Sequence, residues 1–207
     1  MNSILDFLTT GGPLMIPLGF CSVLMVAVII ERIVNLRLKR IIAPEVVQLV
    51  ETIRNPEDLN LSLAILDKNP GSLSTVIRSA IENRDLAGEE LRNLVRDVGH
   101  GESKRIERGQ IVLEAIAGIA PLLGLLGTVV GMIRVFRVIA SVGVGDANAL
   151  SAGISEALIT TAVGLSIAIP ALAAYHFFSS RIEEIVLEME RVSSLLLAKL
   201  RTFGGRA

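Results

Sequence analysis

One apolar stretch, Ala147 to Ser180, constrains this chain more than any other part of its sequence. It holds 34 residues and a single formal charge, Glu156. A helix of about 20 apolar residues crosses the hydrocarbon core of a bilayer, so the stretch is long enough to span a membrane. A central charge in such a helix costs roughly 2.5–3.5 kcal/mol on insertion scales, so Glu156 is expected to face a bundle interior or a wet cavity. The alternative is a place at the headgroup boundary, where a carboxylate suits the start of a helix.

The residues that follow Glu156 support an interior position. Thr160 lies one helical turn beyond it and Thr161 slightly round from it, so both hydroxyls border its face. Gly153, Ala157 and Thr161 recur every four residues, a spacing that lets membrane helices approach closely. Pro170 has no N–H to donate and leaves a backbone acceptor open within the span.

Composition places the chain among all-α polytopic membrane proteins. Of its 207 residues, 51% are hydrophobic, and they form three long apolar runs. The formal net charge is −1, and there is no basic stripe with interleaved aromatics, so nucleic acid is not an expected partner. One cysteine, Cys21, excludes an intrachain disulfide and a cysteine-rich metal site. We expect no cofactor.

The distribution of basic residues predicts the orientation. Segment 1–12 has no Lys or Arg, and the first predicted span, 13–30, is followed directly by Arg32, Arg37, Lys39 and Arg40. Under the positive-inside rule the N-terminus lies outside and segment 31–110 in the cytoplasm. Of the 20 Lys and Arg residues, 18 fall in 31–110 or 181–207. The remaining predicted segments are a second span at 111–140, an outer loop at 141–150, a third span at 151–178 and a cytoplasmic C-terminal helix at 179–207.

Segment 31–110 is predicted to fold as a helical cytoplasmic domain. Four helical patterns are separated by Asn55-Pro56, by the turn Asn69-Pro70-Gly71 and by a short polar stretch, and Pro44 suits the first position of the first helix. Leu59, Leu63 and Leu66 share one face of the second helix. The C-terminal segment is amphipathic and is expected to pack on these helices; its apolar positions are Ile182, Ile185, Met189, Val192, Leu196, Leu200 and Phe203.

The second span combines a bare face with isolated polar groups. Gly124, Gly127 and Gly131 leave one side without side chains, and Thr128 stands on that side. We expect this face and the ridge after Gly153 to join copies of the chain. Thr128 either lines a pathway or bonds a carbonyl of its own helix. Pro121 marks a local bend, and Glu114, near the inner boundary, either lines a pore or reaches the surface.

Two motifs on consecutive helices resemble the MotA/TolQ/ExbB proton channel family. They are APLLGLLGTVVGM at residues 120–132 and GISEALITTAVGL at residues 153–165, the latter followed by Ile169-Pro170. Three spans place the resemblance in the ExbB/TolQ branch. It implies a homo-oligomeric, pentameric ring in the bacterial inner membrane, in contact with lipid and built around single-span ExbD/TolR-like partners. Such a ring uses proton flow to drive a TonB/TolA-type envelope protein. Glu156 matches the family's intramembrane carboxylate, and Thr128 and Thr161 match its threonines.

Arg134 and Arg137 depart from the family pattern. They could pair with Asp146 in the outer loop, bind lipid headgroups, or reach Glu156 and favour its ionised form. The last possibility bears on how Glu156 would carry a proton.

Two other functions have some support in the sequence. One is a scaffold that holds a single-span partner and conducts nothing. The other is an intramembrane protease, because Gly164-Leu-Ser166-Ile resembles a rhomboid-type serine motif. His176 lies ten residues from Ser166 on the same helix, about 15 Å away, whereas a Ser–His pair needs about 3 Å. We therefore do not expect an enzyme.

Overall fold

The computed structural model describes residues 11–36, 41–143 and 147–204, and within these ranges it is helical without strands. The all-α prediction is confirmed for this part of the chain. The outermost N-terminal residues, the basic residues Arg37, Lys39 and Arg40, and the loop residue Asp146 lie outside the described ranges, so the expectations placed on them remain predictions.

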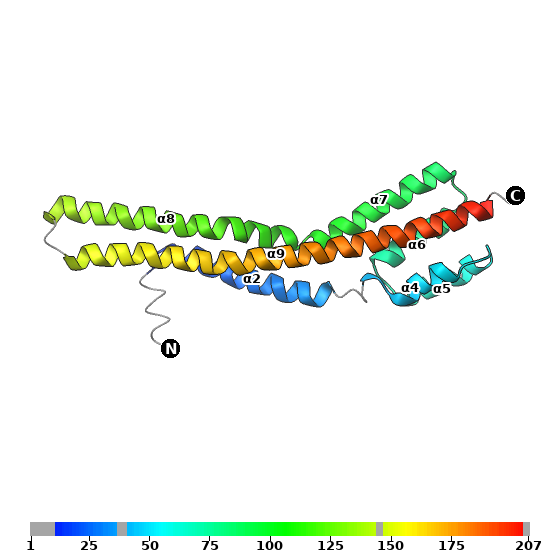
Figure 1. Cartoon of the computed structure of the whole chain (residues 1–207), viewed down its shortest axis with the longest axis horizontal. Coiled ribbons are helices and arrows are strands. Elements are labelled where there is room, and N and C mark those ends of the chain that lie inside the picture. Colours follow the sequence, from blue (N-terminus) through cyan, green and yellow to red (C-terminus); the bar gives the residue numbers. More distant parts are fainter. Residues whose placement is uncertain (1–10, 37–40, 144–146, 205–207) are drawn as a thin grey trace. The chain divides into compact units, whose positions relative to one another are not determined.

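Three helices are long and apolar enough to cross a membrane (Figure 1). They are α2 (Met15–Asn35), α8 (Gln110–Val142) and α9 (Ala147–Gly204). Four shorter helices lie between α2 and α8: α4 (Pro44–Thr52), α5 (Asp58–Lys68), α6 (Ser72–Glu82) and α7 (Gly88–Glu107). Arg108 and Gly109 form a turn, so α7 and α8 are separate helices rather than one continuous helix.

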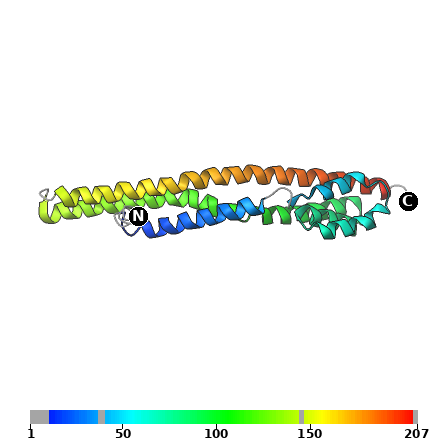
Figure 2. The same ribbon diagram turned by 90° about the horizontal axis from the view of Figure 1, so that it is seen from below.

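The chain divides into two compact units. Unit 1 comprises residues 1–31 and 109–177, and unit 2 comprises residues 32–108 and 178–207. In unit 1, α8 and the first part of α9 run side by side, as Figures 1 and 2 both show. Large apolar side chains such as Phe20, Leu122 and Ile169 are more than 60% exposed there, as expected of helices that face lipid or other membrane helices.

Unit 2 has an apolar core to which the last part of α9 contributes. Its fully buried side chains include Val46, Val50, Leu59, Leu66, Leu73, Ile77, Ile81, Ile185, Val192 and Leu196. Six of the seven apolar positions predicted for the C-terminal helix are at most 7% exposed, and Phe203 is half-buried. The amphipathic prediction for this helix is therefore confirmed. Leu63 is half-buried, whereas Leu59 and Leu66 are fully buried.

Lys199 ties α9 to the C-terminal end of α4. Its Nζ donates to the backbone carbonyls of Val50 at 2.8 Å, Glu51 at 2.6 Å and Ile53 at 2.9 Å. The last carbonyls of a helix have no partner within it and carry its negative dipole end, so an ammonium group is well placed there. Arg191 of α9 adds an ion pair to Glu51 at 3.8 Å.

Arg32 caps the C-terminal end of α7 in a similar way. Its side chain is buried, 7% exposed, and its Nη1 donates to the carbonyl of Ile106 at 2.6 Å. Ile106 belongs to the last turn of α7, where carbonyls lack intrahelical partners. A charged residue at the end of the first apolar helix is thus part of the interior of unit 2.

At the start of α5, the carboxylate of Asp58 satisfies two loop amides. The N–H groups of Arg54 and Asn55 donate to Asp58 Oδ2 at 3.1 and 3.0 Å. These backbone hydrogen bonds favour the ionised form and hold the pKa of Asp58 below its usual range. The turn before α5 is therefore fixed by a side chain from the helix that follows it.

Replacing Lys199 by Met should loosen the last turn of α4. The variant keeps most of the side-chain length but removes three donors, and a charge-assisted bond contributes about 1.5–3 kcal/mol. We expect amide hydrogen exchange in this turn to accelerate at least about tenfold, equivalent to about 1.4 kcal/mol. The measurement is exchange mass spectrometry on the full chain in detergent. Arg201→Met, an exposed position on the same helix, is the matched control and should leave α4 unchanged.

Candidate functional site

The charged centre of unit 1 is an ion pair between α8 and α9. Nη1 of Arg134 donates to both carboxylate oxygens of Glu156, at 2.7 Å to Oε1 and 2.8 Å to Oε2. The Glu156 side chain is 16% exposed, and that of Arg134 is 47% exposed. Of the three roles considered for Arg134, the structure therefore selects the one that reaches Glu156. Arg137 is exposed and forms no ion pair with any residue in the described ranges.

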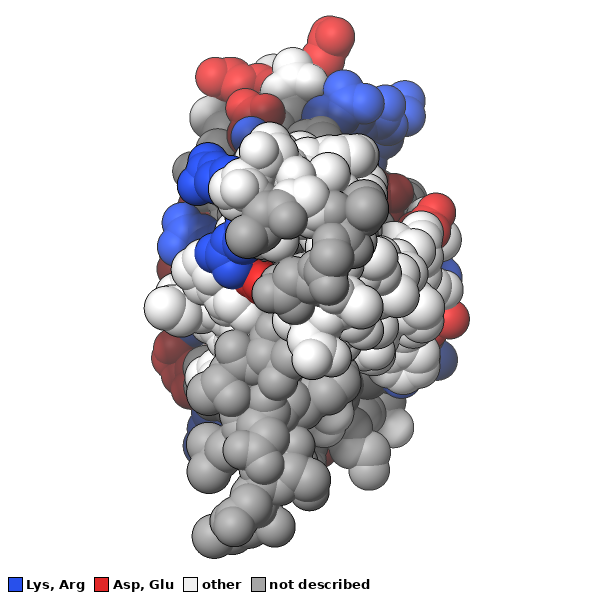
Figure 3. Space-filling model, turned by 90° about the vertical axis from the view of Figure 1, so that its left-hand side faces the viewer, with Lys and Arg blue, Asp and Glu red and all other residues white. Residues whose placement is uncertain are grey.

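The end of unit 1 where α8 meets α9 carries few charges on its described surface (Figure 3). Figure 3 looks at the end where α8 finishes and α9 begins, and its nearer described surface is mostly uncharged. Arg134 lies eight residues before the end of α8 and Glu156 nine residues after the start of α9. At 1.5 Å per residue, both are about 12–14 Å from those helix ends.

The N-terminal turn closes over the same carboxylate. Gly12 has a φ of +69°, in the left-handed region that favours glycine. A Cβ built on Gly12 would lie 1.9 Å from Glu156 Oε1 and 2.9 Å from its Cδ. The backbone of this turn can therefore approach the carboxylate only because position 12 has no side chain. This contact was not predicted from the sequence, although the pair Gly11-Gly12 before a Pro does indicate a tight turn.

Below the ion pair, α8 and α9 pack almost backbone to backbone. A Cβ on Gly131 would lie 2.9 Å from the Ala157 Cβ, and one on Gly127 would lie 2.5 Å from the Thr160 Cβ. Further along, a Cβ on Gly124 would be 3.0 Å from Thr161 Cα. We call this contact the glycine seam. It consists of Ala120, Gly124, Gly127, Gly131 and Val135 on α8, and Gly153, Ala157, Thr160, Thr161 and Gly164 on α9.

The glycine seam lies within one chain. We expected these residues to join copies of the chain, but each ridge meets the other ridge of the same protomer. Gly164, which was not predicted to belong to the ridge, continues it: a Cβ there would lie 2.6 Å from the Ala120 carbonyl oxygen. The seam leaves no space for a polar pathway between α8 and α9.

Each predicted threonine donates its hydroxyl to a backbone carbonyl. Thr160 donates to Glu156 at 2.5 Å, and Thr128 donates to Leu125 of its own helix at 2.6 Å. Thr161 donates to Gly124 on α8 at 3.0 Å, so its hydroxyl crosses the seam. Thr160 is 1% exposed, whereas Thr128 and Thr161 are half-buried. Of the three, Thr160 contacts the backbone carbonyl of Glu156, and the Thr161 hydroxyl links α9 to α8.

The other predicted positions lie away from the ion pair along the helices. Glu114 is exposed on α8, 20 residues before Arg134. Pro121 lies within α8 and is half-buried, and Pro170 lies within α9 and is exposed. His176 and Ser166 are both exposed, and Ser166 donates to the carbonyl of Ala162 at 2.8 Å. The Ser166 hydroxyl thus bonds within its own helix, ten residues before His176.

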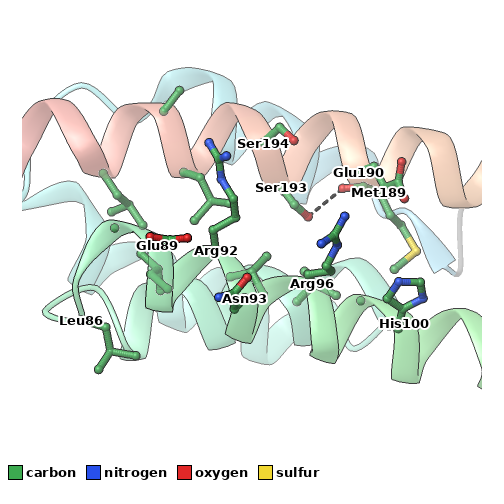
Figure 4. A pocket seen from close by; sticks show the side chains of 18 of the residues that line it. Leu86, Glu89, Arg92, Asn93, Arg96, His100, Met189, Glu190, Ser193 and Ser194 are labelled. Carbon is green, nitrogen blue, oxygen red and sulfur yellow. Dashed lines mark hydrogen bonds between the residues drawn. The ribbon is translucent and has the colours of Figure 1, made fainter.

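Unit 2 contains a groove between α7 and the last part of α9, shown in Figure 4. Arg92 and Arg96 extend from α7 towards α9, which contributes Ser193 and Ser194 to the same groove. The groove is lined by four arginines and by four acidic residues: Arg84, Arg92, Arg96, Arg201, Asp85, Glu89, Glu107 and Glu190. These charges balance, so the groove does not select an anion or a cation by net charge. Among the described residues, no cluster of His, Cys, Asp or Glu is placed to hold a metal ion.

Comparison with known proteins finds a family whose members this chain resembles. Residues 69–191 match the model of the MotA/TolQ/ExbB proton channel family. The chain is 33% identical over 183 residues to ExbB-like biopolymer transport protein 1 of Synechocystis sp., covering 86% of this chain and 71% of that protein. It is 29% identical over 196 residues to biopolymer transport protein exbB1 of Vibrio cholerae, covering 92% of this chain and 85% of that protein.

A TolQ relative matches a shorter region. The chain is 40% identical over 85 residues to the Tol-Pal system protein TolQ of Pseudomonas aeruginosa, covering 41% of this chain and 37% of that protein. The family match covers more than half of the chain and includes Arg134, Glu156 and the glycine seam.

A bulky residue in the glycine seam should disrupt the pairing of α8 with α9. Gly127→Leu places side-chain atoms where Thr160 lies, and overpacking of this kind costs about 1–3 kcal/mol or more. We expect a lower thermal unfolding midpoint of the detergent-solubilised chain. Gly118→Leu is the matched control, because Gly118 is on the same helix and a Cβ there meets nothing within 4 Å. Equal midpoints for the two variants would contradict the seam.

Proposed function

Because this chain belongs to the MotA/TolQ/ExbB proton channel family, we propose that it is the ring-forming subunit of a complex that converts the proton-motive force into work in the bacterial envelope. It is a multi-pass membrane protein, and its relatives include biopolymer transport proteins and a Tol-Pal component. The proposed ring contains five copies around single-span partners of the ExbD/TolR type. Through them it would drive an envelope-spanning protein of the TonB/TolA type.

The observation that carries this proposal is the position of Glu156. It is the one charged residue between Ala147 and Ser180, it is mostly buried, and it lies inside the family-matched region. A carboxylate that is kept in a membrane helix at a cost of a few kcal/mol is a functional candidate by default. Glu156 would accept and release protons, because carboxylates are effective proton carriers when they are placed in a low-dielectric site.

The closed seam supports one route for the proton over another. Backbone contact between α8 and α9 leaves no path along the inside of a protomer. Exchange would therefore take place at the exposed edge of Glu156, towards a carboxylate on the partner's span. In this proposal Thr161 holds α8 and α9 at a fixed spacing, while Thr128 and Glu114 line the surface that meets the partner.

A second candidate function is a scaffold that holds the single-span partner without moving protons. The observation in its favour is the ion pair itself, since Arg134 neutralises Glu156 within the chain. A neutralised carboxylate can act as a permanent tie between two helices. The two candidates differ in whether Glu156 must change its protonation state.

Glu156→Gln separates these candidates. The amide keeps the shape of the side chain and accepts a hydrogen bond from Arg134, but it cannot exchange a proton. We expect normal protein level and ring mass but no partner-driven work and no proton flux in cells that express the full complex. Glu156→Asp should keep part of the activity. Full activity of Glu156→Gln would reject proton transport and favour the scaffold.

Two threonine variants refine the same assay. Thr161→Val removes the hydroxyl bond to Gly124 across the seam, whereas Thr160→Val removes a bond within α9. We expect Thr161→Val to impair work more than Thr160→Val, because only Thr161 links the two helices through its hydroxyl. A stronger effect of Thr160→Val, at equal protein level, would contradict this assignment.

The proposed orientation places the N-terminus outside and the C-terminus in the cytoplasm. In a chain with Cys21 replaced by Ser, a cysteine at Asn148 should react with a membrane-impermeant thiol reagent added to intact spheroplasts. Cysteines at Asn69 and Thr202 should react only after lysis. Labelling of the Asn69 position in intact cells would reverse the proposed topology.

A further inference from the structure

The ion pair between Arg134 and Glu156 occupies both oxygens of the carboxylate. One guanidinium nitrogen donates to Oε1 at 2.7 Å and to Oε2 at 2.8 Å. An arginine guanidinium does not lose its proton in a protein, and an ionised carboxylate accepts hydrogen bonds at both oxygens, so the geometry matches an ion pair. A protonated Glu156 would bring one O–H donor and a weaker acceptor to the same place. The ion pair and a bound proton therefore compete for Glu156.

The packing of the helices fixes Arg134 opposite Glu156. Three residues before Arg134, Gly131 packs on Ala157 and on the backbone of Gly153. Immediately after Arg134, Val135 packs on Gly153 at a distance that leaves no room for a Cβ there. Contacts on both sides of Arg134 thus set the register of α8 against α9. The packing therefore holds positions 134 and 156 opposite each other on the two helices.

Among the described residues, Arg134 is the charged group that contacts the Glu156 carboxylate. The N-terminal turn presents the backbone of Gly12 to the carboxylate, and α9 presents the uncharged Thr160 one turn further on. On α8, Arg137 makes no ion pair with the described residues. The Arg134 side chain is 47% exposed in the single chain and that of Glu156 is 16% exposed, so Arg134 is the less enclosed partner of the pair.

We propose that Arg134 is a positioning residue that holds Glu156 in a closed, ionised state, and that uptake of a proton by Glu156 releases Arg134. This proposal rests on the proposed function and names its regulation. In the step, a proton adds to one carboxylate oxygen, the two N–H···O contacts from Arg134 are lost, and the guanidinium keeps its charge. The pair changes from net neutral to +1. Proton entry is thereby coupled to the movement of a cation on α8.

The test is the reaction of Glu156 with dicyclohexylcarbodiimide, which modifies protonated carboxyl groups in apolar surroundings. The full chain is purified with its co-expressed partner, reconstituted into vesicles, and analysed by peptide mass spectrometry at Glu156. We expect slow labelling of the wild type and labelling at least five times faster in Arg134→Gln. Arg134→Lys, which keeps a cation but not the guanidinium, should fall between them. Arg137→Gln is the matched control and should label like the wild type.

A second variant disturbs the pair without touching Arg134. Gly12→Ala puts a Cβ where the Glu156 carboxylate lies, so the carboxylate must move away from its partner. We expect faster labelling in this variant as well, and it carries the test should Arg134→Gln fail to assemble. Labelling of Arg134→Gln or Gly12→Ala at the wild-type rate, in correctly assembled protein, would overturn the proposal.

The labelling assay and the work assay test separate claims, so their outcomes can be told apart. Faster labelling in Arg134→Gln together with full work by Glu156→Gln would support the closed state held by Arg134 and would reject proton transport by Glu156. Unchanged labelling together with a loss of work in Glu156→Gln would keep proton transport and reject the role of Arg134.

Discussion

The close approach of α8 and α9 is the constraint on which the rest of unit 1 depends. Gly124, Gly127 and Gly131 remove side chains from one helix, and Gly153, Ala157 and Gly164 reduce them on the other. Without a hydrophobic driving force in lipid, membrane helices associate through such packing. The contact also sets the register of the two helices, which brings Arg134 to Glu156 and the Thr161 hydroxyl to the Gly124 carbonyl. The polar contacts between α8 and α9 therefore depend on the small residues that let the two helices approach each other.

The three threonines and the Glu156 carboxylate of the two spans find their partners within the chain itself. The three threonines donate to carbonyls, and the carboxylate accepts from a guanidinium. In lipid an unsatisfied polar group costs several kcal/mol, so this arrangement is a stable resting state. In the proposed function, the carboxylate must nevertheless leave this state in each cycle. Of the two side chains of the pair, Arg134 is the more exposed, at 47% against 16% for Glu156.

Periodic patterns were predictable from the sequence, and long-range pairings were not. The apolar runs gave three helices that could cross a membrane, and the spacing from Ile182 to Leu200 gave a buried face. Glu156 was identifiable because a lone charge stands out in a 34-residue apolar stretch. The partner of Arg134 remained open among three choices, because helix periodicity says nothing of the register between two helices. For the same reason the small-residue ridges could not be assigned to contacts within a chain or between chains. The contacts of Gly12 and Lys199 join segments about 145 residues apart, beyond the reach of any local pattern.

Arg32 has a consequence for how the chain is made. In the proposed orientation it belongs to the basic residues that keep the segment after the first span in the cytoplasm. In the finished protein the same guanidinium is buried against the Ile106 carbonyl. Membrane insertion therefore depends on the positive charge of this residue. The folded domain depends on a hydrogen-bond donor of this length and shape. Lysine at this position would satisfy biogenesis and still leave the mature helix end poorly capped.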